Sequence, residues 1–197
     1  YKPRLATIAC NTASTIALAM VREVLRIPFV GTVPPSKPAA ALTLTGAIGL
    51  LGTEATIRQA YVDRLEAEFA VGKRLIRHAA PELVAAAEAK LRGLPVSGTA
   101  VEEAVAALRS QAPDMDTVVL ACTHFPLLAP ELAEAFGPAV RLVDGAAGIA
   151  RRIASLTAGQ PWARKASDLA VVTGELDRSQ AFSDTLRRYG IERVEHL

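Results

Sequence analysis

Aromatic side chains are scarce in this chain of 197 residues, where phenylalanine, tyrosine and tryptophan together account for 5% of the residues. Proteins that bind single-stranded nucleic acid stack its bases on aromatic rings, so the scarcity argues against such a surface. The formal net charge of +2 argues neither for nor against it. We expect no nucleic-acid partner.

Cysteine is also rare, and long apolar runs are absent. Two thiols far apart in sequence, Cys10 and Cys122, do not make the disulfide framework of a small secreted domain. No apolar run approaches the roughly 20 residues that a transmembrane helix needs. The first residues do not have the pattern of a signal peptide. We therefore expect a cytoplasmic protein that does not contact a membrane.

Short apolar runs alternate with segments of helical periodicity along most of the chain. Strands are predicted at 5–9, 28–33, 47–51, 118–121, 140–143 and 169–172, with a last edge strand at Val194. Helices are predicted at 13–25, 39–44, 81–91, 98–109, 126–136, 146–157 and 179–189. A further helix should open at 52–54 and carry Ile57, Tyr61, Leu65 and Phe69 on one apolar face. This alternation predicts an α/β protein with parallel sheets.

A proline-rich segment, Pro-Pro-Ser-Lys-Pro at 34–38, interrupts this alternation. Prolines so closely spaced are typical of a linker or crossover, and we expect the chain to enter a second domain here. We place its return near Asp144. The first domain would then be discontinuous, comprising 1–34 and 144–197, and the second domain would comprise 35–143.

The main functional signal is a repeated pattern in which an apolar strand ends in Ala-Cys. Residues 5–12 read Leu-Ala-Thr-Ile-Ala-Cys-Asn-Thr, and residues 118–126 read Val-Val-Leu-Ala-Cys-Thr-His-Phe-Pro. Ligands of open α/β sheets bind outside the carboxyl ends of the strands. If two α/β units face each other across a cleft, Cys10 and Cys122 can approach one molecule from opposite sides. A thiolate that removes a proton from one face and a thiol that returns one to the other would invert a carbon stereocentre.

Other roles for the cysteines remain open at this point. Most cysteines are buried and inert, although two matching copies flanked by Asn11, Thr12, Thr123 and His124 favour a function. A redox pair lacks the Cys-x-x-Cys spacing. A zinc site has little support, because there are only two thiols and one nearby imidazole, so we expect no metal.

Three other residues near strand ends are candidates for the same site. His124 can tune or reprotonate the neighbouring thiol, or it can merely bond a loop carbonyl. Thr53 and Thr56 open a helix after a strand, where a carboxylate would be favoured, although helix capping alone explains Thr53. The remaining histidines, His78 and His196, are expected at the surface in helical or terminal polar segments.

The two cysteine motifs, at 9–14 and 120–128, closely resemble the two signatures of glutamate racemase, in the aspartate/glutamate racemase family. Further similar segments lie at 30–34, 37–39, 48–53, 143–146 and 172–174, with Thr56 and Tyr61. The resemblance thus covers essentially all of the chain. It implies two parallel-sheet α/β domains related by a pseudo-twofold repeat, with the active-site cleft between them.

The resemblance also implies an activity. Members of the family interconvert L- and D-glutamate without a cofactor and supply D-glutamate for bacterial peptidoglycan. By resemblance, Cys10 acts on the α-hydrogen of D-glutamate, Cys122 acts on that of L-glutamate, and His124 assists Cys122. The residues expected to hold the polar groups of glutamate are Asn11, Thr12, Thr53, Thr56 and Thr123. A homodimer is expected.

One departure from the family pattern concerns the start of the chain. In that family a strand followed by Asp-Ser-Gly, and later a Pro-Tyr-Gly loop, precede the first cysteine motif, and neither is in this sequence. We expect an N-terminally incomplete first domain with an unpaired sheet edge or an uncovered apolar face, and little activity from this chain. The alternatives are an aspartate or related amino-acid racemase and an inactive ligand-binding module on the same scaffold.

Overall fold

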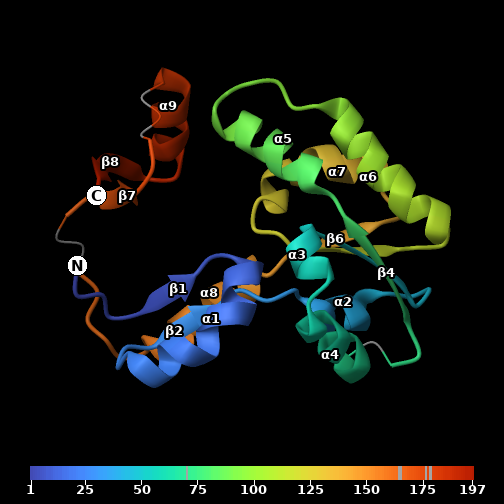
Figure 1. The fold of residues 1–197 in the computed structure, drawn as a ribbon, viewed down its shortest axis with the longest axis horizontal. Coiled ribbons are helices and arrows are strands. Elements are labelled where there is room, and N and C mark those ends of the chain that lie inside the picture. The colour runs from blue at the N-terminus through green and yellow to red at the C-terminus, as the bar shows by residue number, and fades with distance from the viewer. Residues whose placement is uncertain (70, 164–165, 176, 178) are drawn as a thin grey trace.

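The computed structural model describes residues 1–69, 71–163, 166–175, 177 and 179–197 (Figure 1). Strands and helices alternate through most of these residues. Every strand pairing that the described residues make is parallel. The predicted α/β class with parallel sheets is therefore confirmed.

A four-stranded sheet forms the centre of the larger part of the molecule. Its strand order is β4-β3-β5-β6. The strands are β3 (Ala47–Gly52), β4 (Arg74–Ala79), β5 (Thr117–Leu120) and β6 (Arg141–Val143). Every residue of β3 and β5 is buried, which explains why both strands are continuous apolar runs in the sequence.

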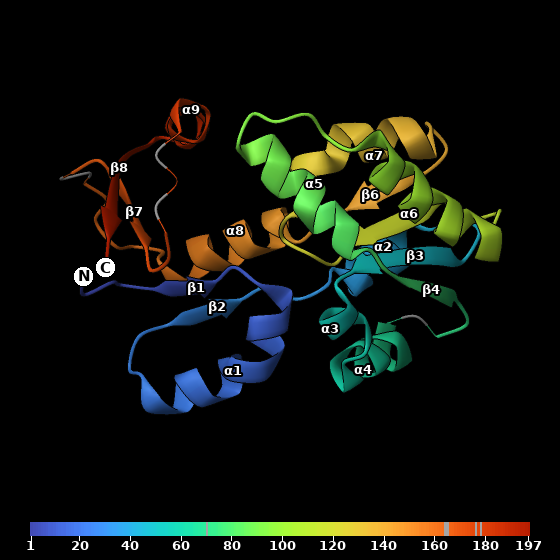
Figure 2. The same cartoon turned by 45° about the horizontal axis from the view of Figure 1, so that its top comes forward.

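Helices cover both faces of this sheet (Figure 2). Successive side chains of a strand point to opposite faces, so Leu51 and Val118 belong to one core while Leu50 and Val119 belong to the other. The helices on the first face are α5 (Pro81–Leu91), α6 (Gly98–Gln111) and α7 (Ala129–Phe136). Those on the second face are α2 (Ser36–Leu42) and α4 (Ala60–Phe69).

A smaller unit is formed by two segments of the chain, one before and one after the central sheet in the sequence. It contains β1 (Ala6–Ile8), α1 (Asn11–Val24), β2 (Phe29–Gly31) and α8 (Ala146–Leu156). The β1–β2 pair lies between α1 and α8, so α8 brings the chain back to the first unit after β6 (Figure 2). A return of the chain near Asp144 was expected; the domain boundaries themselves stay a prediction.

The C-terminal residues form a separate strand–helix–strand unit. It consists of β7 (Asp168–Val172), α9 (Gln180–Arg188) and β8 (Ile191–His196). In the described part of the chain, β7 and β8 form a sheet of their own and are not hydrogen-bonded to β1 or β2. Helix α9 packs near the end of α5 (Figure 1).

Helix α1 carries an exposed apolar face. Ile16, Met20 and Val24 follow one another at intervals of four residues and are 65%, 61% and 71% exposed. Within the described ranges, no helix has the combination of length and apolar character needed to cross a bilayer.

Two predicted features of the chain path differ in the structure. The segment 34–38, predicted as a linker or crossover, is in part helical: α2 begins at Ser36, and the proline at its third residue still lies in the first turn, where the missing N–H costs little. The entry into a second domain at this segment stays a prediction. The helix expected to run through Ile57 and Tyr61 is two helices, α3 (Glu54–Ile57) and α4. The break between them turns α4, so that it buries Val62 in place of the expected Tyr61.

Strand β4 was not predicted, and His78 lies on it rather than in a helical or terminal segment. Its sequence, Arg-Leu-Ile-Arg-His-Ala, lacks the apolar character of the inner strands because β4 is an edge strand. Arg77 pairs with Asp63 and Glu66 of α4, which keeps a charged side chain stable beside the sheet.

Candidate active site

Both cysteines follow the carboxyl ends of parallel strands, as predicted. Cys10 is the N-cap of α1, and the Ala13 backbone N–H donates a hydrogen bond to its Sγ at 3.5 Å. Cys122 lies two residues after β5, where Ala121 still donates to the Leu51 carbonyl at 2.7 Å. Cys122 begins a turn that leads into the short 3₁₀ helix η1 (Phe125–Leu128), which stops the strand.

The two thiols differ in their surroundings. Cys10 is exposed, whereas Cys122 retains 8% exposure and lines a cavity of about 190 Å³ together with Asn11, Thr32 and Thr123. Burial raises the pKa of the Cys122 thiol, and the nearby charge of Cys10 raises it further. Cys122 is therefore not sealed in an apolar core, and it is held toward its protonated form.

Four threonines join the unit of α1 to the central sheet. The hydroxyl of Thr12 lies 3.0 Å from that of Thr56, which lies 3.1 Å from that of Thr53. The Thr123 hydroxyl donates to the Ala9 carbonyl at 3.2 Å. These contacts bring the start of α1 to the carboxyl edge of β3 and β5, so the predicted threonines lie where the two units meet.

Asn11 has an unused hydrogen-bonding group at this junction. Its side chain is 4% exposed, and its Oδ1 atom has no hydrogen-bond partner in the part of the chain that the structure describes. A buried polar atom without a partner costs free energy, so it is a candidate to accept a hydrogen bond from a ligand. The residue lines the same cavity as Cys122.

His124 is held by a carboxylate, Glu88, that was not predicted from the sequence. Its Nδ1 lies 3.9 Å from Cys122 Sγ, and its Nε2 lies 2.8 Å from Glu88 Oε1 on α5. The other oxygen of Glu88 pairs with Arg92. Hydrogen bonds from Arg92, and then from His124, lower the pKa of the Glu88 carboxyl and keep it ionised. Both ring nitrogens of His124 therefore face side chains, whereas the alternative role predicted for His124 was a hydrogen bond to a loop carbonyl.

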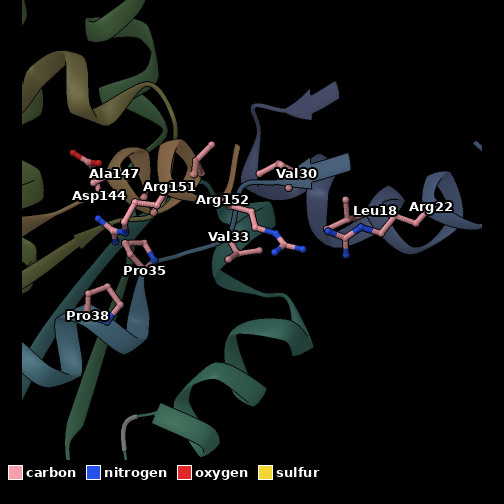
Figure 3. A pocket seen from close by; sticks show the side chains of 14 residues that line it. Leu18, Arg22, Val30, Val33, Pro35, Pro38, Asp144, Ala147, Arg151 and Arg152 are labelled. Atoms are coloured by element: carbon pink, nitrogen blue, oxygen red, sulfur yellow. The ribbon is translucent and has the colours of Figure 1, made fainter. Parts of the chain in front are cut away.

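Figure 3 shows the lining of a second cavity, of about 500 Å³. It lies between α1 and α8, and Arg22 and Arg152 extend into it from these two helices, with Arg151 also at its wall. The first residues of α8 line it as well, and there the Asp144 carboxylate accepts a hydrogen bond from the Ala146 N–H at 2.7 Å. The two cavities share the wall residues Val33, Pro35, Asp144, Gly145 and Ile149.

The sequence model of a known family, described as "Asp/Glu/Hydantoin racemase", matches residues 3–153. The chain belongs to this family. Racemases are isomerases, so the family membership assigns the chain to that class of enzyme.

Individual members of the family are similar over nearly the whole chain. A glutamate racemase of Sphingopyxis alaskensis is 56% identical over 198 residues, which cover 99% of this chain and 74% of the relative. A glutamate racemase of Salmonella typhimurium is 42% identical over 199 residues and is covered to 70%. The crystal structure of Escherichia coli glutamate racemase "in complex with L-Glutamate and activator UDP-MurNAc-ala" has a TM-score of 0.89 at 39% identity; the match covers 100% of this chain and 75% of that one. The predicted two-domain α/β fold of this family is thereby confirmed.

The fold brings the predicted site residues of this racemase family member to one region. Asn11 and Thr12 come from the start of α1, directly after Cys10. The others come from the carboxyl edge of the central sheet: Thr53, Thr56, Cys122, Thr123 and His124. Among the residues that the structure describes, no three His, Cys, Asp or Glu side chains are grouped as metal ligands.

Proposed function

We propose that this protein interconverts L-glutamate and D-glutamate by proton transfer between two cysteine thiols, without a cofactor. The observation that carries the proposal is the pair of thiols, each two residues past the carboxyl end of a parallel strand, with Thr123, next to Cys122, hydrogen-bonded to the carbonyl of Ala9, next to Cys10. The three relatives described above are all named glutamate racemases, which supports glutamate as the substrate.

In the direction from D-glutamate, the Cys10 thiolate takes the α-proton. An S–H bond forms at Cys10 as the Cα–H bond breaks, and the electron pair passes into the α-carboxylate as an enediolate. The Cys122 thiol then gives its proton to the opposite face of Cα and becomes a thiolate. The raised pKa of Cys122 suits this step, because a buried thiol stays protonated until the carbanion needs its proton.

In the direction from L-glutamate, Cys122 must first lose its proton. His124 Nδ1 lies beside Cys122 Sγ and is the group that can accept this proton. Glu88 holds the opposite edge of the ring and stabilises the imidazolium that forms. Cys122 then removes the α-proton from L-glutamate, and the Cys10 thiol returns one to the other face.

Polar groups around the thiols would bind the charged ends of the amino acid. The Asn11 amide oxygen lacks a partner among the described residues and can accept from the α-ammonium group. The hydroxyls of Thr12, Thr53, Thr56 and Thr123 can donate to carboxylates. In the structure these hydroxyls bond to one another or to the backbone, so glutamate would exchange one set of hydrogen bonds for another.

The test follows the optical signal of D-glutamate by circular dichroism, with a chelator present and no cofactor added. In ²H₂O, inversion by two thiols should place one solvent deuteron on Cα of each product molecule. Turnover of D-aspartate at a higher kcat/KM than D-glutamate would favour an aspartate racemase. Binding of glutamate by calorimetry with no deuterium incorporation would favour a ligand-binding module and contradict the enzyme.

The biological role follows from the same chemistry. D-Glutamate is a component of bacterial peptidoglycan, so we propose that the enzyme supplies it from the cytoplasm. We also propose a homodimer, which sedimentation equilibrium can test.

A specific observation also favours regulation by an anionic nucleotide. The E. coli relative was crystallised with the activator UDP-MurNAc-ala, and the uridine diphosphate part of such a molecule carries two phosphates. The second cavity of this chain has Arg22, Arg151 and Arg152 at its wall, three cations against the one carboxylate of Asp144, and this excess of positive charge favours phosphate. We propose that this cavity binds such an activator.

Calorimetric titration with UDP-MurNAc-ala tests this second proposal. Binding should weaken by about tenfold or more when Arg152 is replaced by Ala, since charged hydrogen bonds contribute roughly 1.5–3 kcal/mol. The same change at the exposed Arg188 of α9 is the control and should leave the Kd unchanged. An unchanged Kd in the Arg152→Ala variant would contradict this location.

A further inference from the structure

A continuous series of polar contacts runs from the C-terminal unit to the buried thiol. Asp177 Oδ2 lies 3.3 Å from Arg92 Nε, and Nη1 of Arg92 pairs with Glu88. Glu88 lies 2.8 Å from His124 Nε2, and His124 Nδ1 lies 3.9 Å from the sulfur of Cys122. The two ends of the series thus lie in different units: Cys122 follows β5 of the central sheet, and Asp177 lies between β7 and α9 of the C-terminal unit.

Arg92 is the member that joins the two units. It caps the carboxyl end of α5, where its Nη1 also donates to the Glu88 carbonyl at 3.1 Å. On the C-terminal unit it meets Asp177 and, at 5.9 Å from the ring centre, the face of Phe182 on α9. Figure 1 shows α9 beside the end of α5 that carries Arg92. The guanidinium is therefore oriented from both sides.

Asp177 is itself well fixed for this purpose. Its Oδ1 accepts from the Ser179 backbone N–H at 2.8 Å, immediately before α9 begins, which leaves Oδ2 to face Arg92. One carboxylate thus bonds the N-cap residue of α9 and orients the arginine. The side chain of Asp177 is 27% exposed, less than the 40% of Arg92.

We propose that Asp177 and Arg92 are positioning residues, which hold Glu88 in place and thereby keep the ring of His124 beside Cys122. The inference rests on the proposed function, because it assigns the C-terminal unit a part in the thiol chemistry of the candidate site. Glu88 has a side chain that is 38% exposed, so without Arg92 its carboxylate would be free to turn toward solvent. A ring that loses its outer hydrogen bond no longer has one orientation.

Simple docking of α9 onto α5 is the alternative, and the two explanations predict opposite changes at Cys122. If the contacts only hold the units together, removing one loosens the structure and makes the buried thiol more accessible. If they position His124, removing one takes a proton acceptor away from Cys122 and lowers its thiolate fraction. The thiolate is the form that reacts with alkylating agents, so loosening should speed alkylation and mispositioning should slow it.

The experiment measures alkylation of both thiols by iodoacetamide at pH 8, by mass spectrometry of the two cysteine peptides. The main variant is Asp177→Asn, which keeps an acceptor for Ser179 and removes the charge that faces Arg92. Asp184→Asn is the matched control, because Asp184 pairs with Arg187 inside α9. His124→Asn gives the rate without an imidazole. Cys10, exposed in the same molecule, serves as the internal reference.

In Asp177→Asn, Cys122 should react about three- to tenfold more slowly, which is less than the roughly 10²-fold cost of moving a catalytic group by about 1 Å. Cys10 should react at the wild-type rate, and Asp177→Glu should restore most of the loss at Cys122. Combined with His124→Asn, the Asp177 change should add little, because both act through one imidazole. An unchanged or faster rate at Cys122, or a full additional loss in the double variant, would overturn the proposal.

Because alkylation needs no turnover, the result separates this proposal from the proposed function. A wild-type protein that does not racemise glutamate, but whose Cys122 slows in Asp177→Asn, would contradict the racemase and support the positioning. A protein that racemises glutamate at equal rates with and without the Asp177 charge, and whose Cys122 rate does not change, would contradict the positioning alone. In an active enzyme, kcat from L-glutamate should fall more than kcat from D-glutamate.

Discussion

The hydroxyl groups of Thr12 and Thr56 lie 3.0 Å apart, although 44 positions separate them in the sequence. Thr12 lies in the first turn of α1 and Thr56 lies in α3, so one hydrogen bond joins the two units that carry the thiols. Each residue follows a strand end and opens a helix, where backbone N–H groups face outward. The contact marks the place where a bound amino acid would meet both units.

Replacement of this hydroxyl pair should affect binding more than stability. Thr56→Val removes an oxygen that two neighbours share, and we expect KM for glutamate to rise about tenfold, in line with roughly 1–1.5 kcal/mol for one hydrogen bond. Steady-state kinetics in both directions measures this. Thr157→Val is the control, because the Thr157 hydroxyl at the end of α8 donates to the Ile153 carbonyl of the same helix. An unchanged KM would remove Thr56 from the binding residues.

Each thiol should be necessary for racemisation. Two-base inversion needs an acid on one face of Cα and a base on the other, so Cys10→Ala and Cys122→Ala should each lower kcat by at least about 10²-fold, the usual contribution of a general acid or base. Circular dichroism of D-glutamate solutions gives the rate, and thermal melting shows whether the variants fold. Turnover near the wild-type rate in either variant would contradict the two-thiol mechanism.

His124 should act in one direction more than in the other. His124→Asn removes the group that accepts a proton from Cys122, so kcat from L-glutamate should fall more than kcat from D-glutamate. The ratio of kcat/KM between the directions is set by the equilibrium and cannot change, so the KM values must shift in compensation. Initial rates from pure enantiomers measure all four constants. Equal losses in both kcat values would reduce His124 to a structural role.

Asp116 should make folding stability sensitive to acid. Burial acts to raise the pKa of Asp116, but hydrogen bonds from Thr43, Leu44, Thr45 and Thr117 outweigh it and lower the pKa to about 2. The folded state therefore binds this proton less readily than the unfolded state does. Its stabilising contribution is complete above about pH 4, the ordinary pKa of aspartate, and is lost as the pH falls toward 2.

Urea unfolding at pH 7 and pH 3 tests the role of Asp116. We expect Asp116→Asn to cost about 1 kcal/mol at pH 7, after allowance for the solvent around a half-buried group, and to flatten the decline between the two pH values. Asp114→Asn is the control, because Asp114 makes an exposed pair with Arg74. An equally steep decline in the Asp116 variant would assign the acid sensitivity to other carboxyl groups.

The inner strands and the thiol motifs could be predicted because their signals are local. Strands β3 and β5 are buried on both faces, so burial alone demands an apolar run at 47–51 and 118–121. The ends of these runs locate Thr53 and Cys122 at the carboxyl edge of the sheet, since side chains after a strand must lie there. Strand β4 had no such signal, because an edge strand carrying Arg74, Arg77 and His78 resembles any polar segment.

The sequence by itself therefore determined the α/β class, the inner strands and the position of each thiol at a strand end, because all three depend on the burial pattern of neighbouring residues. Only the tertiary structure decided which side chains meet. Glu88 lies 36 positions before His124, and it reaches the imidazole because α5 packs beside η1. Asp177 reaches Arg92 because α9 packs against the end of α5. Such pairs depend on how helices pack across a sheet, and no local pattern of residues records that packing.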